Sequence, residues 1–407
     1  MSENPLRVGI IGFGMIGKVH AFAHQAMSYY APLLPIRCQI TSVATIHKET
    51  AEKAKRIIGC DFATTNFKEI TENPDIDIVH ICSPNDQHFP ALLSAIRQNK
   101  NIYCDKPLVV SLNEAKKIDA ELSRTDSQGK RLYTKTSQMT FHLRFFSAIK
   151  RMKQILDENR IGRIFQYRIG YYHASNISRQ TPFKWKHGES GGAIRDLVSH
   201  LLDLVDFLIG LPEELLADSI IAYPNRPLPL ASAKNVSNAT YYQTVESEDS
   251  VSILTRGLLN PPASSDPLFS PVQGVIEASK LATGCEDDLR LEIHGEKGAL
   301  RFSLMNPHYL EFFDATLSDR PFGGYSGWLQ IPCGGRYEFP DADFPSHKSS
   351  TGWIRAHIAS LSNFLNDIAN NRPGNPSLLQ GIRIQSALDA VAKSCQSRLW
   401  TPVLTDN

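Results

Sequence analysis

The sequence of 407 residues lacks an excess of charge of either sign and a long apolar run. Lys and Arg number 43 against 42 Asp and Glu, which leaves a formal net charge of +1. This balance gives no electrostatic reason to expect a nucleic-acid or anionic-membrane partner. No apolar run approaches the roughly 20 residues that span a bilayer, and the N-terminus lacks the pattern of a secretion leader. We therefore expect a cytoplasmic protein with no nucleic-acid and no membrane partner.

Closely spaced cysteines that would bind a metal or form a disulfide are also lacking. The seven cysteines are scattered and include no C-x-x-C pair, which argues against a disulfide framework and against a zinc cluster. His20 and His24 are four residues apart on a predicted helix and in principle suit a metal, but no third ligand is evident nearby. We therefore predict no metal site.

The first part of the chain alternates short apolar runs with helix-like segments. The strand-like runs are residues 7–11, 39–46, 76–82, 101–104 and 131–136. Strands separated by helices indicate βαβ units, because parallel neighbours need a crossover connection. We predict an α/β fold class with a doubly wound parallel sheet, a Rossmann domain, over residues 1–137.

The pattern changes in residues 138–407. Strand-like runs there follow one another with few helices between them: 164–172, 250–254, 272–279, 289–294, 299–304 and 309–313. Such runs favour an α+β domain with a large, mostly antiparallel sheet over these residues. We also expect a helix at 193–209, two closing helices at 353–370 and 378–397, and long loops at 260–271 and 316–350.

A glycine-rich motif follows the first predicted strand directly and opens a helix. Its residues are Gly12, Phe13, Gly14, Met15, Ile16 and Gly17, a G-x-G-x-x-G pattern. In this context the glycines permit a tight turn, close backbone approach to a pyrophosphate and close packing of helix on strand. The helix N-terminus then presents free N–H groups to the phosphates. The motif predicts a dinucleotide site.

The choice between NAD and NADP stays open. The end of the second predicted strand carries Ala44 and Thr45, with no acid before Glu49. An acid at this place binds the adenosine ribose and disfavours NADP. Thr45 can donate to a ribose hydroxyl or to a 2′-phosphate, while His47 and Lys48 can balance added charge.

Three further motifs follow in order. They are Ser83-Pro84-Asn85-Asp86-Gln87-His88, then Cys104-Asp105-Lys106-Pro107, then Gly191-Gly192-Ala193-Ile194-Arg195-Asp196-Leu197-Val198-Ser199-His200. Together with the glycine loop, these motifs resemble the glucose–fructose oxidoreductase / inositol dehydrogenase / rhizopine catabolism (Gfo/Idh/MocA) family over nearly the whole chain.

The resemblance implies that Lys106, Asp196 and His200 are catalytic and contact the substrate. Lys106 follows a strand whose carboxyl end faces the cofactor crevice, and the family's Lys-Pro peptide bond is often cis. Asp196 and His200 are four residues apart and share a face of the predicted helix. A histidine beside an aspartate is suited to act as a general base. Without the resemblance, a surface lysine and a core histidine would be the better interpretation.

Other residues are candidates for cofactor or substrate contact. Besides the glycine loop and Thr45, the predicted cofactor-binding residues are Ser83, Pro84, Asn85, His88, Asp105 and Lys106. For His88, a purely structural role is an open alternative. The substrate-side candidates His142, Arg144 and Trp185, with the neighbouring Lys184 and Lys186, are equally compatible with ordinary packing or surface charge.

The resemblance implies an NAD(P)-dependent dehydrogenase that oxidises a secondary hydroxyl of a sugar, glycoside or cyclitol, with NAD slightly favoured. One alternative is an enzyme that retains its NAD and oxidises C3 only transiently, as a glycosidase or epimerase. Another is a non-catalytic, cofactor-binding regulator, which has no chemical need for Lys106, Asp196 and His200 together. The resemblance implies that residues 138–407 serve substrate binding and oligomerisation. A homodimer or homotetramer is expected, because the second domain's open sheet suits back-to-back pairing, which is common in the family.

Overall fold

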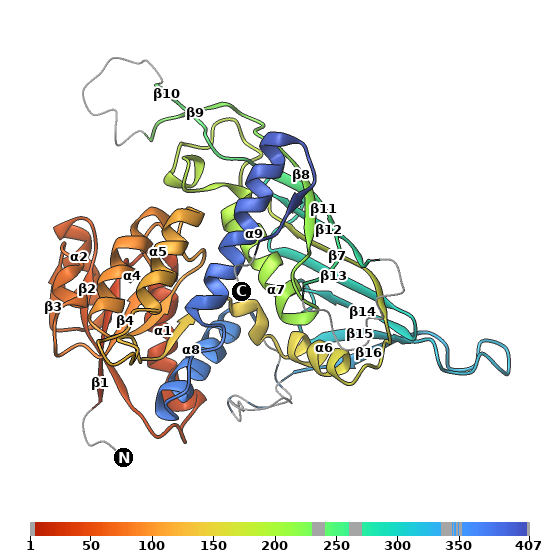
Figure 1. Ribbon diagram of the computed structural model, residues 1–407, viewed down its shortest axis with the longest axis horizontal. Coiled ribbons are helices and arrows are strands. Elements are labelled where there is room, and N and C mark those ends of the chain that lie inside the picture. The colour runs from red at the N-terminus through yellow and green to blue at the C-terminus, as the bar shows by residue number, and fades with distance from the viewer. Residues whose placement is uncertain are drawn as a thin grey trace. The chain divides into compact units, whose positions relative to one another are not determined.

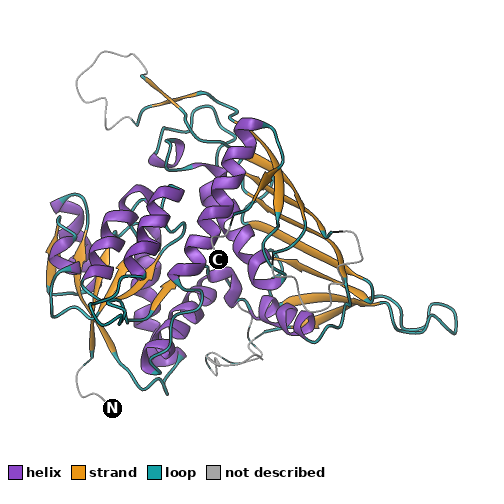
Figure 2. Ribbon diagram, viewed as in Figure 1, coloured by secondary structure: helices purple, strands orange, loops and turns teal. Residues whose placement is uncertain are grey.

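The computed structural model describes residues 5–229, 241–259, 271–334 and 352–404, with residues 344, 346 and 349. Contacts divide the chain into two compact units. The first contains Met1–Phe146 and Gly334–Gln385, and the second contains Ser147–Cys333 and Ser386–Asn407. Figures 1 and 2 draw the elements of both units.

The first unit is a Rossmann domain. Its six strands are all parallel and lie in the order β3-β2-β1-β4-β5-β6. Their bounds are β1 Leu6–Ile11, β2 Cys38–Ala44, β3 Phe62–Thr64, β4 Ile78–Ile81, β5 Asn101–Cys104 and β6 Ser137–Met139. The strand order reverses between β1 and β4, and ligands of such sheets bind at the carboxyl ends of the strands at this switch point.

Helices lie between the strands of the first unit, as the alternating pattern predicted. They are α1 Met15–Tyr30, α2 Lys48–Ile58, α3 Lys68–Thr71, α4 His88–Arg97 and α5 Leu112–Leu122, with short turns η1 Asn85–Gln87 and η2 His142–Phe145. Gly59, in the left-handed conformation, ends α2, and the Ser111 side chain caps α5 by accepting from the Glu114 N–H. These are the stop and start signals that glycine and serine provide.

Two details of this sheet differ from the prediction. The run 131–136 is not a strand: the last strand is β6, and Arg131 forms only an isolated bridge with Thr125. Strand β3 was not predicted, because its three residues are at most half-buried and carry little apolar signal. An edge position explains the weak pattern of β3, since an edge strand has only one neighbour.

Helix α8, Trp353–Ala369, belongs to the first unit although it lies far along the chain. Its residues Leu361, Phe364 and Leu365 are buried in the same apolar core as Val8 and Ile10 of β1. The Tyr103 hydroxyl of β5 donates to Ser360 Oγ at 2.8 Å, which ties the helix to the sheet. Helix α8 therefore completes the apolar core of the Rossmann unit from a distant part of the chain.

The second unit contains a nine-stranded mixed sheet, mostly antiparallel, in the order β16-β15-β14-β13-β7-β12-β11-β8-β17. Its strands are β7 Ile164–Tyr172, β8 Glu214–Ile220, β11 Ser250–Arg256, β12 Gln273–Ser279, β13 Asp288–Gly295, β14 Gly298–Ser303, β15 Tyr309–Asp314, β16 Trp328–Pro332 and β17 Thr401–Pro402. A separate hairpin joins β9 Asn225–Pro227 to β10 Tyr242–Thr244. Strands β7 and β12 are parallel, so their carboxyl ends meet.

The second unit also contains helices and short helical turns. They are α6 Ser147–Asp157, the short turn η3 Trp185–His187, the π-helical turn η4 Ile194–Val198, α7 Ser199–Leu208 and the later part of α9 Leu378–Ser397. Burial alternates along β11 and β12, as expected for strands with one face against helices and one face open. The predicted helix 193–209 is thus present, but its first turn is π-helical.

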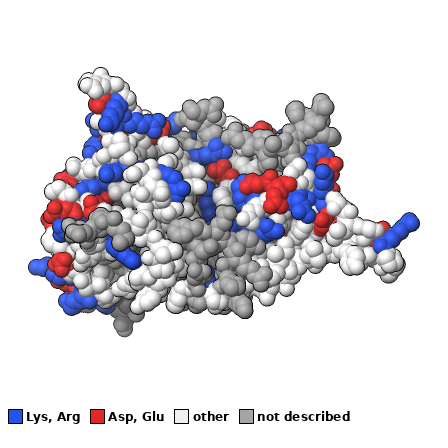
Figure 3. Space-filling model, turned by 90° about the horizontal axis from the view of Figure 1, so that it is seen from below, with Lys and Arg blue, Asp and Glu red and all other residues white. Residues whose placement is uncertain are grey.

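The surface and the loops complete the comparison with the sequence. Lys and Arg are interspersed with Asp and Glu on the face drawn in Figure 3. In the described part of the chain, no helix is long and apolar enough to cross a bilayer. The predicted loop 260–271 lies, except for its last residue, outside the described residues. Of 316–350, the described part up to Gly334 includes strand β16, and most of the remainder lies outside the described residues.

Candidate active site

The glycine loop lies at the switch point of the Rossmann sheet. The Gly12 N–H donates to the Ala44 carbonyl at 2.8 Å, and the Cys82 N–H donates to the Ile11 carbonyl at 2.7 Å. The loop after β1 is thereby fixed beside the ends of β2 and β4. Next to it, the buried Ser83 hydroxyl has no hydrogen-bond partner among the described residues. An unsatisfied hydroxyl beside free helix N–H groups fits the phosphates and ribose of a dinucleotide.

We predict that Gly17→Ala destabilises the first unit, whereas Gly14→Ala does not. A Cβ at Gly17 would lie 2.2 Å from the Gly12 carbonyl oxygen, while a Cβ at Gly14 meets nothing within 4 Å. Overpacking against backbone costs about 1–3 kcal/mol. Urea denaturation checks the stability of both variants. Gly14→Ala is expected to weaken dinucleotide binding only, because its open space is where a pyrophosphate approaches; equal stability of the two variants would contradict this account.

His88 links two of the sequence motifs. Its Nδ1 lies 2.9 Å from the Pro107 carbonyl and its Nε2 lies 3.0 Å from the Ser83 carbonyl, and the ring is fully buried. Both ring nitrogens therefore face backbone, which favours the structural role left open by the sequence. The Lys106–Pro107 peptide bond is cis, as the resemblance implied.

The remaining predicted residues of the first unit lie near the strand ends. Asp105 accepts from the Thr140 hydroxyl at 2.7 Å, and Lys106 follows it at the end of β5. His142 and Arg144 are buried in η2. Thr45, after β2, bonds the His47 carbonyl and the Thr50 hydroxyl at 3.0 and 2.5 Å, so its hydroxyl is engaged in the turn.

His357 of α8 was missed by the sequence analysis. Its ring stacks on that of His142 with centroids 4.0 Å apart and an interplanar angle of 15°. Burial, and then the charges of His142, His20 and Lys106, hold the pKa of His357 well below its usual value. No local motif marks this histidine, because α8 joins the Rossmann unit from a distant part of the chain.

One edge of the sheet in the second unit gathers polar residues from several strands. The His173 N–H, after β7, donates to the Ser279 carbonyl at 2.7 Å, and Lys280 follows β12. Asp287, before β13, accepts from the Tyr171 hydroxyl at 2.6 Å and lies 3.2 Å from His173 Nε2. Parallel β7 and β12 end at the same edge, so residues distant in sequence become neighbours.

The predicted catalytic helix begins against this edge, since η4 packs against β12. Glu248 Oε1 accepts from the Ile194 N–H at 2.6 Å, and burial raises the pKa of Glu248. Gly192 permits this approach: its φ is +90°, and a Cβ there would lie 2.3 Å from Glu248 Oε1. π-helical turns are rare and occur frequently at functional sites.

Asp196 lies in the π-helical turn and is held by two lysines. Lys186 Nζ lies 3.0 Å and Lys280 Nζ lies 3.1 Å from the same oxygen, Asp196 Oδ2. His200 is 6% exposed and packs edge-on to Tyr171, with ring centroids 6.1 Å apart. Trp185, 43% exposed, lies beside Lys186, whose ammonium is 5.7 Å from the centre of the indole ring. Lys280 was not predicted from the sequence.

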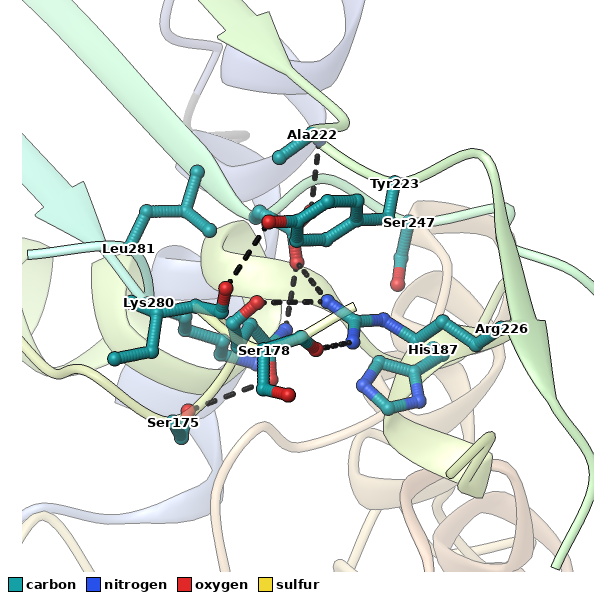
Figure 4. A network of polar contacts seen from close by, with 12 residues as sticks. Ser175, Ser178, His187, Ala222, Tyr223, Arg226, Ser247, Lys280 and Leu281 are labelled. Atoms are coloured by element: carbon teal, nitrogen blue, oxygen red, sulfur yellow. Dashed lines mark hydrogen bonds and ion pairs between the residues drawn. The ribbon is translucent and has the colours of Figure 1, made fainter. Parts of the chain in front are cut away.

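A buried polar network lies beneath this edge (Figure 4). Arg226 is fully buried and donates to the carbonyls of Ser178 and Asn176 at 2.9 and 3.0 Å. Asp249 accepts from the Asn176 amide at 2.6 Å and lies 3.8 Å from the Arg226 guanidinium. Burial, and then the charge of Arg226, lowers the pKa of His187 to about 4. The network fixes the loops that carry the candidate residues.

The structure thus gathers the predicted site residues into two groups. The first unit brings together the glycine loop, Thr45, the Ser83–His88 segment, Asp105, Lys106, His142 and Arg144 at the strand ends of the Rossmann sheet. The second unit brings together Asp196, His200, Trp185 and Lys186. Among the described residues, no group of His, Cys, Asp and Glu is arranged to hold a metal ion.

Comparison with known proteins adds the family. The family model described as "Oxidoreductase family, NAD-binding Rossmann fold" matches residues 6–133, and "GFO/IDH/MocA C-terminal domain" matches residues 149–301. Levoglucosan dehydrogenase of Pseudarthrobacter phenanthrenivorans is 26% identical over 98% of this chain and 98% of that protein. Inositol 2-dehydrogenase of Rhizobium meliloti is 27% identical, with 96% of each chain covered.

Solved structures agree in fold. Levoglucosan dehydrogenase in complex with NADH and levoglucosan has a TM-score of 0.85 at 24% identity, over 99% of this chain and 100% of that chain. An NAD-binding oxidoreductase from Klebsiella pneumoniae has a TM-score of 0.86 at 24% identity with the same coverage. The glycine loop, the later motifs and both family models lead to one assignment: this chain belongs to the Gfo/Idh/MocA family of oxidoreductases.

Proposed function

We propose that the protein is an NAD(P)-dependent dehydrogenase that oxidises a secondary hydroxyl of a sugar, glycoside or cyclitol. The observation that carries the proposal is the helix in which Asp196, held by two ammonium groups, precedes a buried His200. The chain joins this helix to a Rossmann unit whose glycine loop and unsatisfied Ser83 hydroxyl suit a dinucleotide. A regulator would have no chemical need for both sets of residues.

In the proposed reaction His200 accepts the proton of the substrate hydroxyl as the general base. Lys106 and Asp196 orient that hydroxyl, and the Lys106 ammonium stabilises the negative charge that develops on its oxygen. When bound, a nicotinamide would supply the acceptor for the hydride from the carbon that carries this hydroxyl. The glycine loop, the Ser83–His88 segment and Asp105 hold the cofactor in this assignment.

The substrate class rests on the relatives and on one side chain. The names of the relatives include levoglucosan, inositol and glucose 6-phosphate as substrates of those proteins. Half-exposed Trp185 offers an aromatic surface that suits the apolar face of a sugar ring. We propose that His142 and Arg144 also contact substrate. NAD is favoured over NADP by the description of the family model, although no acid lies between the end of β2 and Glu49. A homodimer or homotetramer remains our proposal for the assembly.

A spectrophotometric assay tests the function. Purified protein is mixed with NAD⁺ or NADP⁺ and a panel of inositols, aldoses and pyranosides, and absorbance of the reduced nicotinamide is followed. We expect reduction with one group of substrates, which would also give the cofactor preference. If no compound of the panel reduces the cofactor but the cofactor stays bound, the result would instead support transient oxidation at C3 by an enzyme of glycosidase or epimerase type. If the protein neither reduces nor binds the cofactor, the proposal would be contradicted.

A further inference from the structure

Lys280 is a buried lysine in direct contact with the proposed catalytic aspartate. Its side chain is 6% exposed, and its Nζ lies 3.1 Å from Asp196 Oδ2. Lys186 contacts the same oxygen at 3.0 Å, but the Lys186 side chain is 45% exposed. An ion pair in solvent contributes little, whereas removing one member of a buried pair leaves the other charge uncompensated. The two lysines therefore differ in how strongly they constrain Asp196.

The backbone of Lys280 is anchored from both sides. Its N–H donates to the Asp249 carbonyl at 2.8 Å, and its carbonyl accepts from the Asn176 N–H at 2.9 Å. Asn176 and Asp249 are themselves joined at 2.6 Å, and fully buried Arg226 lies against both. Figure 4 shows Lys280 beside this network. A side chain that starts from a fixed point at the end of β12 has fewer positions open to its ammonium.

The contact links two different elements. Asp196 lies in η4, the π-helical turn, while Lys280 follows β12 of the sheet. The main-chain bonds of η4 do not fix the carboxylate, because χ1 and χ2 of an aspartate remain rotatable. A charge-assisted bond from the sheet edge fixes both the direction and the ionised form of that carboxylate. A displacement of about 1 Å in a catalytic group can cost about 100-fold in rate.

We propose that Lys280 is a positioning residue that holds Asp196 ionised and oriented for the proton and hydride transfer. This inference rests on the proposed function, because Asp196 has to act on the substrate for its orientation to affect turnover. Lys186 contributes to the same oxygen from solvent and has the smaller role. In this proposal, the edge of the sheet at which β12 ends takes part in catalysis through Lys280. None of the four sequence motifs includes this residue.

Three lysine-to-methionine variants test the inference by steady-state kinetics. Lys280→Met is expected to lower kcat by about 100-fold with little change in KM, as for an interaction needed in the transition state. Lys186→Met is expected to lower kcat by less than about tenfold. Lys393→Met removes a third lysine–aspartate pair of the same unit, that with Asp389 at 2.7 Å, and controls for the general loss of an ion pair. Thermal unfolding of each variant identifies any misfolded protein.

Two further readouts separate positioning from a structural effect. Lys280→Arg, which keeps the charge, is expected to recover at least about tenfold of the lost rate. The acidic limb of the kcat/KM profile is expected to move to higher pH in Lys280→Met, because a carboxylate that loses a neighbouring cation takes up a proton more readily. Equal kinetics of Lys280→Met and Lys393→Met in an active enzyme would overturn the inference and leave the proposed function intact.

If the wild-type protein turns over no substrate, the proposed function fails, but the contact can still be tested. The Asp196 carboxyl can be followed by ¹³C NMR as pH is varied. A titration that moves to higher pH in Lys280→Met and not in Lys393→Met would support the electrostatic hold on Asp196. Identical titrations in the two variants would overturn it.

Discussion

Lys106→Ala is expected to lower kcat/KM by about 1000-fold while the dissociation constant of the dinucleotide changes little. Removing one donor to a developing oxyanion costs about 10²–10³ in rate. The cofactor, by contrast, depends chiefly on the glycine loop and on the Ser83 segment, which the substitution does not touch. Steady-state kinetics and fluorescence titration with NADH measure the two effects. Lys53→Ala, an exposed lysine on α2, is the matched control and should behave as wild type.

The Lys106 experiment also tests whether the two groups of candidate residues act together. If Lys106 and His200 act on one hydroxyl, Lys106→Ala combined with His200→Ala should lose far less than the product of the single losses, as residues that act as a unit do. Multiplicative losses would contradict a shared site. Unchanged activity of Lys106→Ala would remove the lysine from the mechanism altogether.

Acidification from pH 7.5 to 5.5 is expected to destabilise the first unit by several kcal/mol. His20 and His80 are almost fully buried and in contact, with their Nδ1 atoms 3.0 Å apart, and His24 Nε2 lies 3.1 Å from His80 Nε2. Burial, and then the charge of His24, lowers the pKa of His20 to about 3. Burial lowers the pKa of His24 to about 4, and burial followed by the charges of its two neighbours holds the pKa of His80 well below its usual value.

The direction of this pH dependence follows from the numbers of protons that the folded and the unfolded states bind. The unfolded chain takes up a proton at each histidine as pH falls through about 6.5, while the folded unit keeps the rings neutral until its own lower pKa values. The free energy of unfolding therefore falls with pH below about 6.5, by about 1.4 kcal/mol per histidine at pH 5.5. His24 retains some solvent exposure and contributes least. Asp367, whose pKa is raised by burial, opposes the trend at more acidic pH.

Hydrogen exchange of peptides from β1 and β4 at several pH values measures this loss in the first unit. His80→Leu removes one titrating ring, so its stability should depend less steeply on pH than that of the wild type, whatever its stability at pH 7.5. His47→Gln, at an exposed position, should leave the slope unchanged. Protection that is the same at pH 7.5 and 5.5 would show that the cluster accepts protons without opening.

The sequence predicted those parts of the fold that have strong local signals. The glycine loop and strand β7 agree closely with the structure, because turn residues and periodicity define them locally. Strand β3 and the position of β6 were missed, since short edge strands depend on their neighbours. The assignment of α8 to the Rossmann unit depends on its contacts with Tyr103 and Gln138, more than 200 positions away along the chain.

The candidate site likewise contains residues that a sequence motif marks and residues that only tertiary packing brings into place. The motifs predict Lys106, Asp196 and His200 as site residues, because the family resemblance rests on residue types at fixed spacings. Lys280 has no such signal: only the pairing of β12 with β7 and the packing of η4 against β12 bring its ammonium to Asp196. His357 likewise reaches His142 only through the packing of α8. The spacing of motif residues in the sequence does not reveal residues that reach the site only through contacts with another residue.

The late position of α8 has a consequence for synthesis on the ribosome. The last strand of the Rossmann sheet, β6, ends at Met139, but α8, which completes its core, starts at Trp353. At translation rates of about 5–20 residues per second, the nascent sheet waits roughly 10–40 s for this helix. During that interval the apolar side chains that α8 will cover are exposed on the emerging chain. Cellular yield should therefore respond to chaperones that shield nascent chains.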